Sequence, residues 1–337
     1  MKQLEAFSLG KRLADPAANE DSLVVLPHRG YAVIDGVTDR NGTRYNGMLS
    51  GQFASRTVQA ATERFLLAQG DKSEADLQYA GPEHFIDYLT RAIFAEYERA
   101  GAVEAVTADW KLRGGCTVMA TMIIGDRLEI VAVGDSGVRI NGTDVLQVLK
   151  PLDDVTAIMR RETWHYFRDL GRDTASCDSL AAAVTWRGTR NQEAGAETAE
   201  PEFLKEIERR ALAACAAHLP EVPEGEILAL VHGGICFAQG DFQNVTEPVL
   251  GYGGLDGFAV PTRYIESRSY ALKDVHTIEL FSDGYFKLGE DFGTASWEQA
   301  FREVEEEDFH KIGPYMSTKG STDVILTDDR TYLGVRL

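Results

Sequence analysis

Three apolar, strand-like segments each end in an aspartate beside a glycine, and this feature constrains the fold of the chain more than any other. The segments are residues 31–36 (YAVIDG), 129–136 (EIVAVGDS) and 276–284 (HTIELFSDG). A strand delivers the side chain at its end to a rigid position, and the neighbouring glycine lets another group approach the backbone closely. The carboxylates therefore come from strand ends that are scattered across the whole chain.

Acidic pairs also stand before two further strand-like segments; these pairs are Glu20-Asp21 and Asp328-Asp329. Residues 22–34 have the pattern of a hairpin, and antiparallel neighbours put the start of one strand beside the end of the next. Glu20 and Asp21 should therefore lie near Asp35. A single Asp-Gly dipeptide is an ordinary turn, but several gathered carboxylates repel one another unless cations neutralise them.

Composition and charge exclude several classes of partner. The chain has 337 residues, of which 44% are hydrophobic, and this suffices for one large domain or two. Its formal net charge of -19 argues against a nucleic-acid or anionic-membrane partner, because phosphate backbones demand a basic surface. No segment resembles a signal peptide or a membrane span, and the four cysteines form no Cys-x-x-Cys pair, so we expect a cytoplasmic protein with reduced thiols.

Helical periodicity predicts two helices, at about residues 50–70 and 82–101. The dipeptides Gly125-Asp126 and Asn141-Gly142 predict hairpin turns further along the chain. Two helices inserted between antiparallel hairpins exclude a simple alternating βαβ fold. A last helix is predicted at about residues 296–304.

Residues 151–220 are predicted to form a helical insertion on one edge of the core, with helices at 154–170 and 201–218. Strand-like segments resume at residues 227–232 and 235–238. Arginines of the first inserted helix, such as Arg160, either bind phosphate or line a solvated helix face.

Carboxylates at strand ends, without a cluster of histidines or cysteines among them, select hard cations such as Mg²⁺ or Mn²⁺. Two such ions ~4 Å apart can hold a hydroxide between them and clamp a phosphoryl group for in-line attack. The sequence contains no Cys-x5-Arg phosphatase loop, no Walker phosphate loop, no His-Glu-x-x-His motif and no Gly-x-Ser-x-Gly elbow. Metal-assisted hydrolysis is therefore favoured over nucleotide transfer and covalent hydrolysis.

The ordered set of these motifs resembles the metal-dependent protein phosphatases of the type 2C (PPM) family over nearly the whole chain. The set comprises residues 19–21 (NED), 33–36 (VIDG), 115–117 (GCT), 133–136 (VGDS), 281–284 (FSDG) and 328–331 (DDRT). The resemblance implies an α+β fold, a four-layer αββα sandwich in which helices flank two antiparallel sheets and a metal cleft lies at one end. Residues 1–337 would form a single domain, with residues 151–220 in the place of the family's variable flap.

The resemblance also assigns roles to individual residues. Asp35 would bridge two Mg²⁺ or Mn²⁺ ions, with Gly36 offering its carbonyl and Glu20 serving one ion. Asp283 and Asp328 would serve the other ion, Asp21 would hold metal-bound water, and Asp135 with Asp283 could hold a weaker third ion. Catalysis would depend on Asp35, Glu20 and Asp21.

The family reaction is hydrolysis of phosphoserine and phosphothreonine in proteins by a metal-bound hydroxide, so a phosphorylated protein is the expected partner. Many members carry a phosphate-gripping arginine four residues before the glutamate, where this chain has Pro16. Arg12 or Lys11 are the nearest replacements, and we take Arg12 as the candidate phosphate-binding residue. Two alternatives remain, a catalytically silent module that binds phosphoproteins or partners and a phosphatase for a small phosphoester.

Overall fold

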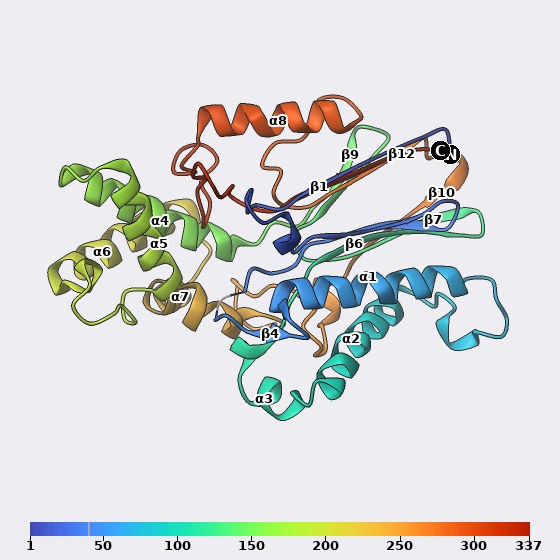
Figure 1. The fold of residues 1–337 in the computed structure, drawn as a ribbon, viewed down its shortest axis with the longest axis horizontal. Coiled ribbons are helices and arrows are strands. Elements are labelled where there is room, and N and C mark those ends of the chain that lie inside the picture. Colours follow the sequence, from blue (N-terminus) through green and yellow to red (C-terminus); the bar gives the residue numbers. More distant parts are fainter. Residues whose placement is uncertain (40) are drawn as a thin grey trace. The chain divides into compact units, whose positions relative to one another are not determined.

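The computed structural model describes residues 1–39 and 41–337 (Figure 1). It contains two compact units. The sandwich unit comprises Met1–Leu149, Gly253–Arg302 and Asp328–Leu337, and the helical unit comprises Lys150–Tyr252 and Glu303–Thr327. The insertion predicted at residues 151–220 thus lies within the helical unit, which also takes in two later stretches of the chain.

The sandwich unit is built on two antiparallel sheets. One sheet has the order β1 (Gln3–Leu9), β12 (Arg330–Arg336), β11 (Thr277–Phe281), β8 (Gly137–Ile140) and β9 (Asp144–Leu146). The other has the order β10 (Glu266–Ala271), β7 (Arg127–Val133), β6 (Val118–Ile124), β3 (Gly30–Ile34) and β2 (Ser22–Leu26). A short ribbon of β4 (Arg44–Tyr45) and β5 (Met48–Leu49) precedes the first helix.

Helices cover the outer face of each sheet, as Figure 1 shows. Helices α1 (Ser50–Ala68) and α2 (Pro82–Arg99), followed by the short α3 (Val103–Ala108), pack on the sheet that contains β3, where Phe53 and Phe85 join its apolar cluster. On the other sheet, Trp297 of α8 (Thr294–Glu307) stacks against Phe281 and Tyr332, with ring centroids 4.7 Å and 5.0 Å away. The predicted fold, two antiparallel sheets flanked by helices in four layers, is confirmed.

Strand β3 shows why the two sheets pack face to face. Tyr31 and Val33 point into the cluster between the sheets, whereas Ala32 and Ile34 point into the cluster under α1 and α2. Successive side chains of a strand alternate between faces, so a strand buried on both sides reads as a continuous apolar run. β3 is therefore a rigid central strand, and Asp35 follows it directly.

The predicted hairpins are also confirmed. β6 and β7 are joined at Gly125-Asp126, and β8 and β9 at Asn141-Gly142. Ile140 pairs with Asp144, so three residues form the second loop, and two of them, Asn141 (φ 54°) and Gly142 (φ 76°), have positive φ angles.

The helical unit consists of α4 (Pro151–Asp169), α5 (Thr174–Arg187), α6 (Pro201–His218) and α7 (Glu224–Phe237), whose apolar faces share one core. The prediction of strands at residues 227–232 and 235–238 was wrong, because residues 227–237 belong to α7 and Ala238 caps this helix. A short apolar run has no face that distinguishes a buried helix from a strand. A kink at Gly234 (φ 60°) interrupts α7 between the two segments.

Arg160 of α4 is a structural residue of the helical unit. It is buried and donates hydrogen bonds to the carbonyl oxygens of His310 (2.7 Å) and Lys311 (3.1 Å). The hypothesis that Arg160 binds phosphate is therefore wrong, and so is the alternative of a solvated position.

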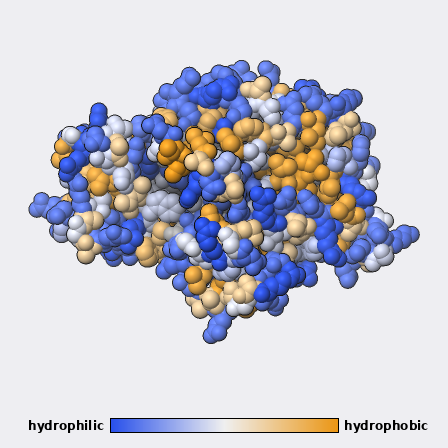
Figure 2. Space-filling model, viewed as in Figure 1, coloured by the Kyte–Doolittle hydropathy of each residue, from blue (hydrophilic) through white to orange (hydrophobic). Residues whose placement is uncertain are grey.

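The face of the molecule drawn in Figure 2 is mainly hydrophilic, with hydrophobic residues in scattered patches. This agrees with the excess of acidic residues (53) over basic ones (34) in the sequence. None of the helices that the structure describes is both long and apolar enough to cross a bilayer.

Candidate functional site

The register of the hairpin β2–β3 brings the first acidic pair to the end of β3. Ser22 is opposite Ile34, so the residues just outside the hairpin, Asp21 and Asp35, lie at the same end of the sheet. The backbone around Asp35 is held further by the strand that leads into β6, since the Asp35 carbonyl accepts a hydrogen bond from the Thr117 amide (2.8 Å). The position of Asp35 is thus fixed by two neighbouring strands.

Gly36 follows Asp35 at a place that no side chain could fill. A Cβ atom there would lie 2.6 Å from the Glu20 carbonyl oxygen and 2.7 Å from that of Gly51. Because both neighbours are backbone atoms, the crowding cannot be relieved by rotating a side chain. The predicted role of the glycine, close approach of other groups to the backbone, agrees with this geometry.

The other sheet brings its acids to the same site. Gly137 of β8 is opposite Phe281 of β11, so Asp135 and Asp283 flank one end of this strand pair. The Ser282 amide donates to the Thr331 carbonyl (3.0 Å), which brings the start of β12, and with it Asp328, to the same end.

Asp21 connects the two sheets. Its Oδ2 atom accepts hydrogen bonds from Ser282 Oγ (2.9 Å) and Thr331 Oγ1 (2.7 Å). Its Oδ1 atom is buried and accepts none within the described part of the chain. Burial, together with the nearby charge of Asp329, raises the pKa of Asp21 to about 8. Asp21 is thus a firmly oriented carboxylate with one oxygen available to another ligand.

Asp35 and Asp283 form the centre of the carboxylate cluster. Burial raises the pKa of Asp35 well above its usual value, and the charges of Asp21, Asp328 and Asp135 act in the same direction. Burial likewise raises the pKa of Asp283, followed by the charges of Asp35, Asp135 and Asp328. Each of these two carboxyl groups therefore lies where further negative charge is unfavourable.

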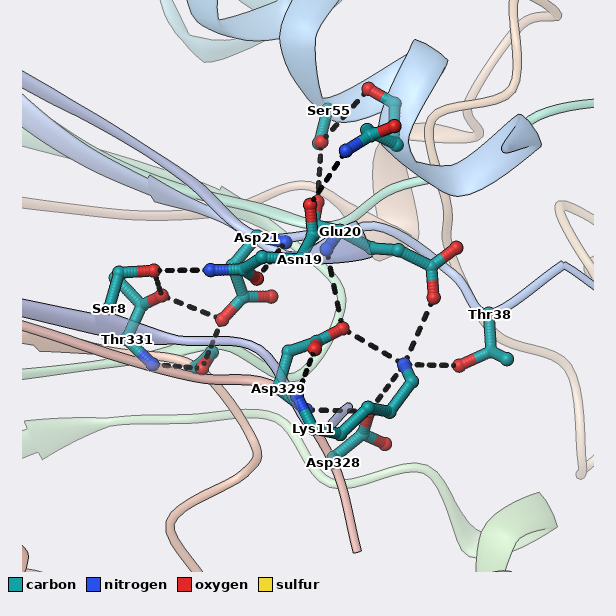
Figure 3. A network of polar contacts seen from close by, with 12 residues as sticks. Ser8, Lys11, Asn19, Glu20, Asp21, Thr38, Ser55, Asp328, Asp329 and Thr331 are labelled. Atoms are coloured by element: carbon teal, nitrogen blue, oxygen red, sulfur yellow. Dashed lines mark hydrogen bonds and ion pairs between the residues drawn. The ribbon is translucent and has the colours of Figure 1, made fainter. Parts of the chain in front are cut away.

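Lys11, two residues after β1, places its ammonium group among the acids Glu20, Asp328 and Asp329 (Figure 3). Its Nζ atom lies 3.0 Å from Glu20 Oε2, 3.1 Å from Asp328 Oδ1, 2.9 Å from Asp329 Oδ2 and 2.9 Å from Thr38 Oγ1. The side chain is only 8% exposed. Burial by itself would lower the pKa of Lys11, but the three carboxylates raise it above its usual value, so the ammonium stays charged.

The structure therefore brings together all the predicted carboxylates, Glu20 and Asp328 through Lys11 and the others around Asp35. Arg12, the predicted phosphate-binding residue, is exposed. Sequence reasoning missed the roles of Lys11 and Asp329. Two features of the sequence could have pointed to these roles: Lys11 directly follows Gly10, and two consecutive aspartates stand at positions 328 and 329.

The donor set fits a hard divalent cation in the part of the cluster around Asp35 and Asp283. Asp283 Oδ1 and Asp21 Oδ1 are buried without a hydrogen-bond partner among the described residues, and carboxylate oxygens are the ligands that Mg²⁺ and Mn²⁺ prefer. In residues 1–39 and 41–337, no three His, Cys, Asp or Glu side chains already have the arrangement of metal ligands. Glu20 and Asp328 are bound to Lys11.

No protein-family model and no curated protein matches the chain. Solved structures similar to it over nearly its whole length are bacterial serine/threonine phosphatases. They include Stp1 of Staphylococcus aureus (12% identity, 100% of this chain and 95% of that chain, TM-score 0.47) and PstP of Mycobacterium tuberculosis (17%, 99% and 98%, TM-score 0.41). One structure of the PstP catalytic domain contains two manganese ions (TM-score 0.41). Because these TM-scores are below 0.5, our description of the fold rests on the strand order and layers of this chain alone.

Proposed function

We propose that this protein is a Mg²⁺- or Mn²⁺-dependent phosphatase that hydrolyses phosphoserine and phosphothreonine in proteins. The observation that supports this best is the gathering of acids from both sheets around Asp35 and Asp283, where Asp21 Oδ1 and Asp283 Oδ1 are buried without a hydrogen-bond partner among the described residues. Such a cluster is costly to bury unless a cation neutralises it. A bound Mg²⁺ or Mn²⁺ would supply Lewis-acid activation of water and would stabilise charge on a phosphoryl group.

Different residues of the site would bind the ion and orient the attacking water. Asp35 and Asp283, with the Gly36 carbonyl and Asp135, would hold the ion. The free Oδ1 of Asp21 would accept a hydrogen bond from the attacking water and orient it, because Ser282 and Thr331 hold the carboxylate in place. These hydroxyl groups would keep Asp21 from rotating as the proton moves.

A second candidate function, a catalytically silent module that binds phosphoproteins, is favoured by one observation. Lys11 already binds Glu20 and Asp328, two of the predicted ligands, and Pro16 stands where the family carries a phosphate-gripping arginine. A phosphatase for a small phosphoester is the third candidate, and nothing in the geometry of the described residues selects it over the first.

Phosphate release from a phosphothreonine peptide and from p-nitrophenyl phosphate, with Mn²⁺ and with EDTA, tests these functions. We expect peptide turnover that needs metal and falls by more than about 100-fold in Asp35→Asn, since even loss of an outer-shell partner costs about 10–100-fold. Asp126→Asn, an exposed turn position, is the matched control and should leave turnover unchanged. Turnover of the ester alone would favour the small-molecule enzyme, and metal binding without any turnover would favour the silent module.

A further inference from the structure

We infer that the ammonium group of Lys11 takes the place of one cation in this carboxylate cluster, so that the site binds a single divalent ion tightly. The inference rests on the proposed function, because it concerns the metal content of the same site. It assigns Glu20 and Asp328 to the lysine, and Asp35 and Asp283 to the metal.

The coordination of Lys11 resembles that of a bound ion more than that of a surface lysine. Four oxygens surround its Nζ atom at 2.9–3.1 Å, and they come from Glu20, Thr38 and the pair Asp328-Asp329. An ammonium group has three protons to donate, so these neighbours use its whole capacity. Lys11 therefore has no proton left to grip a phosphate, and the hypothesis that it replaces the family arginine is not supported.

Asp329 anchors both ends of Lys11. Its Oδ1 atom accepts a hydrogen bond from the Lys11 backbone amide (2.6 Å), and its Oδ2 atom accepts one from Nζ (2.9 Å). The same Oδ2 atom also accepts a longer bond from the Glu20 amide (3.4 Å). The long, flexible side chain of Lys11 is thereby held in one place, so its ammonium group has a fixed position in the site.

The charges divide the cluster into two parts. A divalent ion that used Glu20 and Asp328 as ligands would have to come within a few ångströms of the ammonium, and at such distances two positive charges repel each other strongly in a buried site. Asp21 Oδ1 and Asp283 Oδ1 mark the other part, since both atoms are buried and have no hydrogen-bond partner among the described residues. This is where a divalent ion would find carboxylate oxygens that Lys11 does not occupy.

The number of bound ions tests the inference without relying on activity. The full chain, freed of metal with a chelator and dialysed, is titrated with Mn²⁺ by calorimetry and by electron paramagnetic resonance, which distinguishes an isolated ion from a magnetically interacting pair. We expect one tight ion with the spectrum of an isolated Mn²⁺. Lys11→Met should bind a second Mn²⁺ ion tightly and show the spectrum of an interacting pair, because the substitution removes the ammonium group that Glu20 and Asp328 bind.

Two control variants complete the experiment. Lys11→Arg keeps the charge and should keep one ion, and Arg12→Met removes an exposed charge one residue away and should also keep one ion. Two tight ions in the wild-type protein, or one ion in both wild type and Lys11→Met, would overturn the inference and leave the proposed function standing. No bound ion at any Mn²⁺ concentration would overturn both, and the wild-type result decides even if Lys11→Met fails to fold.

Discussion

Replacing Glu279 by leucine is expected to destabilise the sandwich unit by about 4 kcal/mol. Glu279 on β11 lies opposite Arg139 on β8, and the two form a buried two-pronged ion pair of 2.7 Å and 2.8 Å. Trp297 Nε1 and the Tyr332 hydroxyl group donate to the same carboxylate, each at 3.0 Å. This network ties together the two strands whose ends carry Asp135 and Asp283.

The magnitude follows from what the substitution leaves behind. Removing one partner of a buried ion pair costs about 3–5 kcal/mol, because the remaining charge is unpaired. The two neutral donors would add about 1–3 kcal/mol each if they found no other acceptor. Arg139 retains the Gly289 and Asp291 carbonyl oxygens as acceptors, which limits the loss. We therefore expect a value near 4 kcal/mol and not the full sum.

Urea unfolding followed by tryptophan fluorescence measures this change, since Trp297 donates directly to Glu279. Trp164 and Trp186 lie in the helical unit, so both are replaced by phenylalanine to isolate the signal of the sandwich unit. With an m-value of about 2–3 kcal/mol/M, the midpoint should fall by about 1.3–2 M urea.

The controls separate an ion-pair effect from a general loss of packing. The exposed Glu98 on α2 offers a matched control, because Glu98→Leu should leave the midpoint unchanged. The double variant Arg139→Leu with Glu279→Leu should recover much of the loss, since apolar residues can replace a buried ion pair with little net cost. A loss below about 1 kcal/mol in Glu279→Leu, or a double variant as unstable as the single one, would refute this reasoning.

Three further outcomes are expected. Asp283→Asn should weaken Mn²⁺ binding by at least about 10-fold in calorimetry. The same substitution removes one charge from a repulsive cluster, so the melting temperature of the metal-free protein should stay the same or rise. Burial lowers the pKa of His232 below 6.5, although the charge of Glu208 opposes this. The unfolded state therefore binds a proton more readily than the folded state, and the melting temperature of the helical unit should fall as the pH falls from about 7 to about 5. His232→Gln should make the melting temperature less dependent on pH in this range. Gly234→Ala should lower the stability of the helical unit by at least about 1–3 kcal/mol in urea unfolding, because φ is 60° there and the new Cβ would lie 2.4 Å from the Gly188 amide nitrogen.

Much of the sandwich unit could be predicted from local patterns. Strand β3 is an uninterrupted apolar run, and its pairing with β2 follows from the short turn between them, so the meeting of Asp21 and Asp35 was predictable from geometry. The helices α1 and α2 have one apolar stripe each, which a period of 3.6 residues detects. In these cases the sequence next to a residue determines its environment.

The parts that could not be predicted depend on distant residues. Helix α7 is apolar on most sides because it lies in the core of the helical unit, so no stripe distinguishes it from a strand. Lys11 contacts Asp329 across 318 residues, and lysines are rarely buried, so neither local spacing nor composition indicates the contact.

The place of β12 in its sheet has a consequence for how the protein is made. β12 lies between β1 and β11, so β1 has no neighbour in its sheet until residues 330–336 have left the ribosome. Until then, the nascent chain exposes unpaired strand edges, which are prone to aggregate. Lys11 and Glu20 are synthesised early, but Asp328 and Asp329 reach them only when β12 inserts. The carboxylate cluster around Lys11 is therefore assembled only after synthesis has passed this strand.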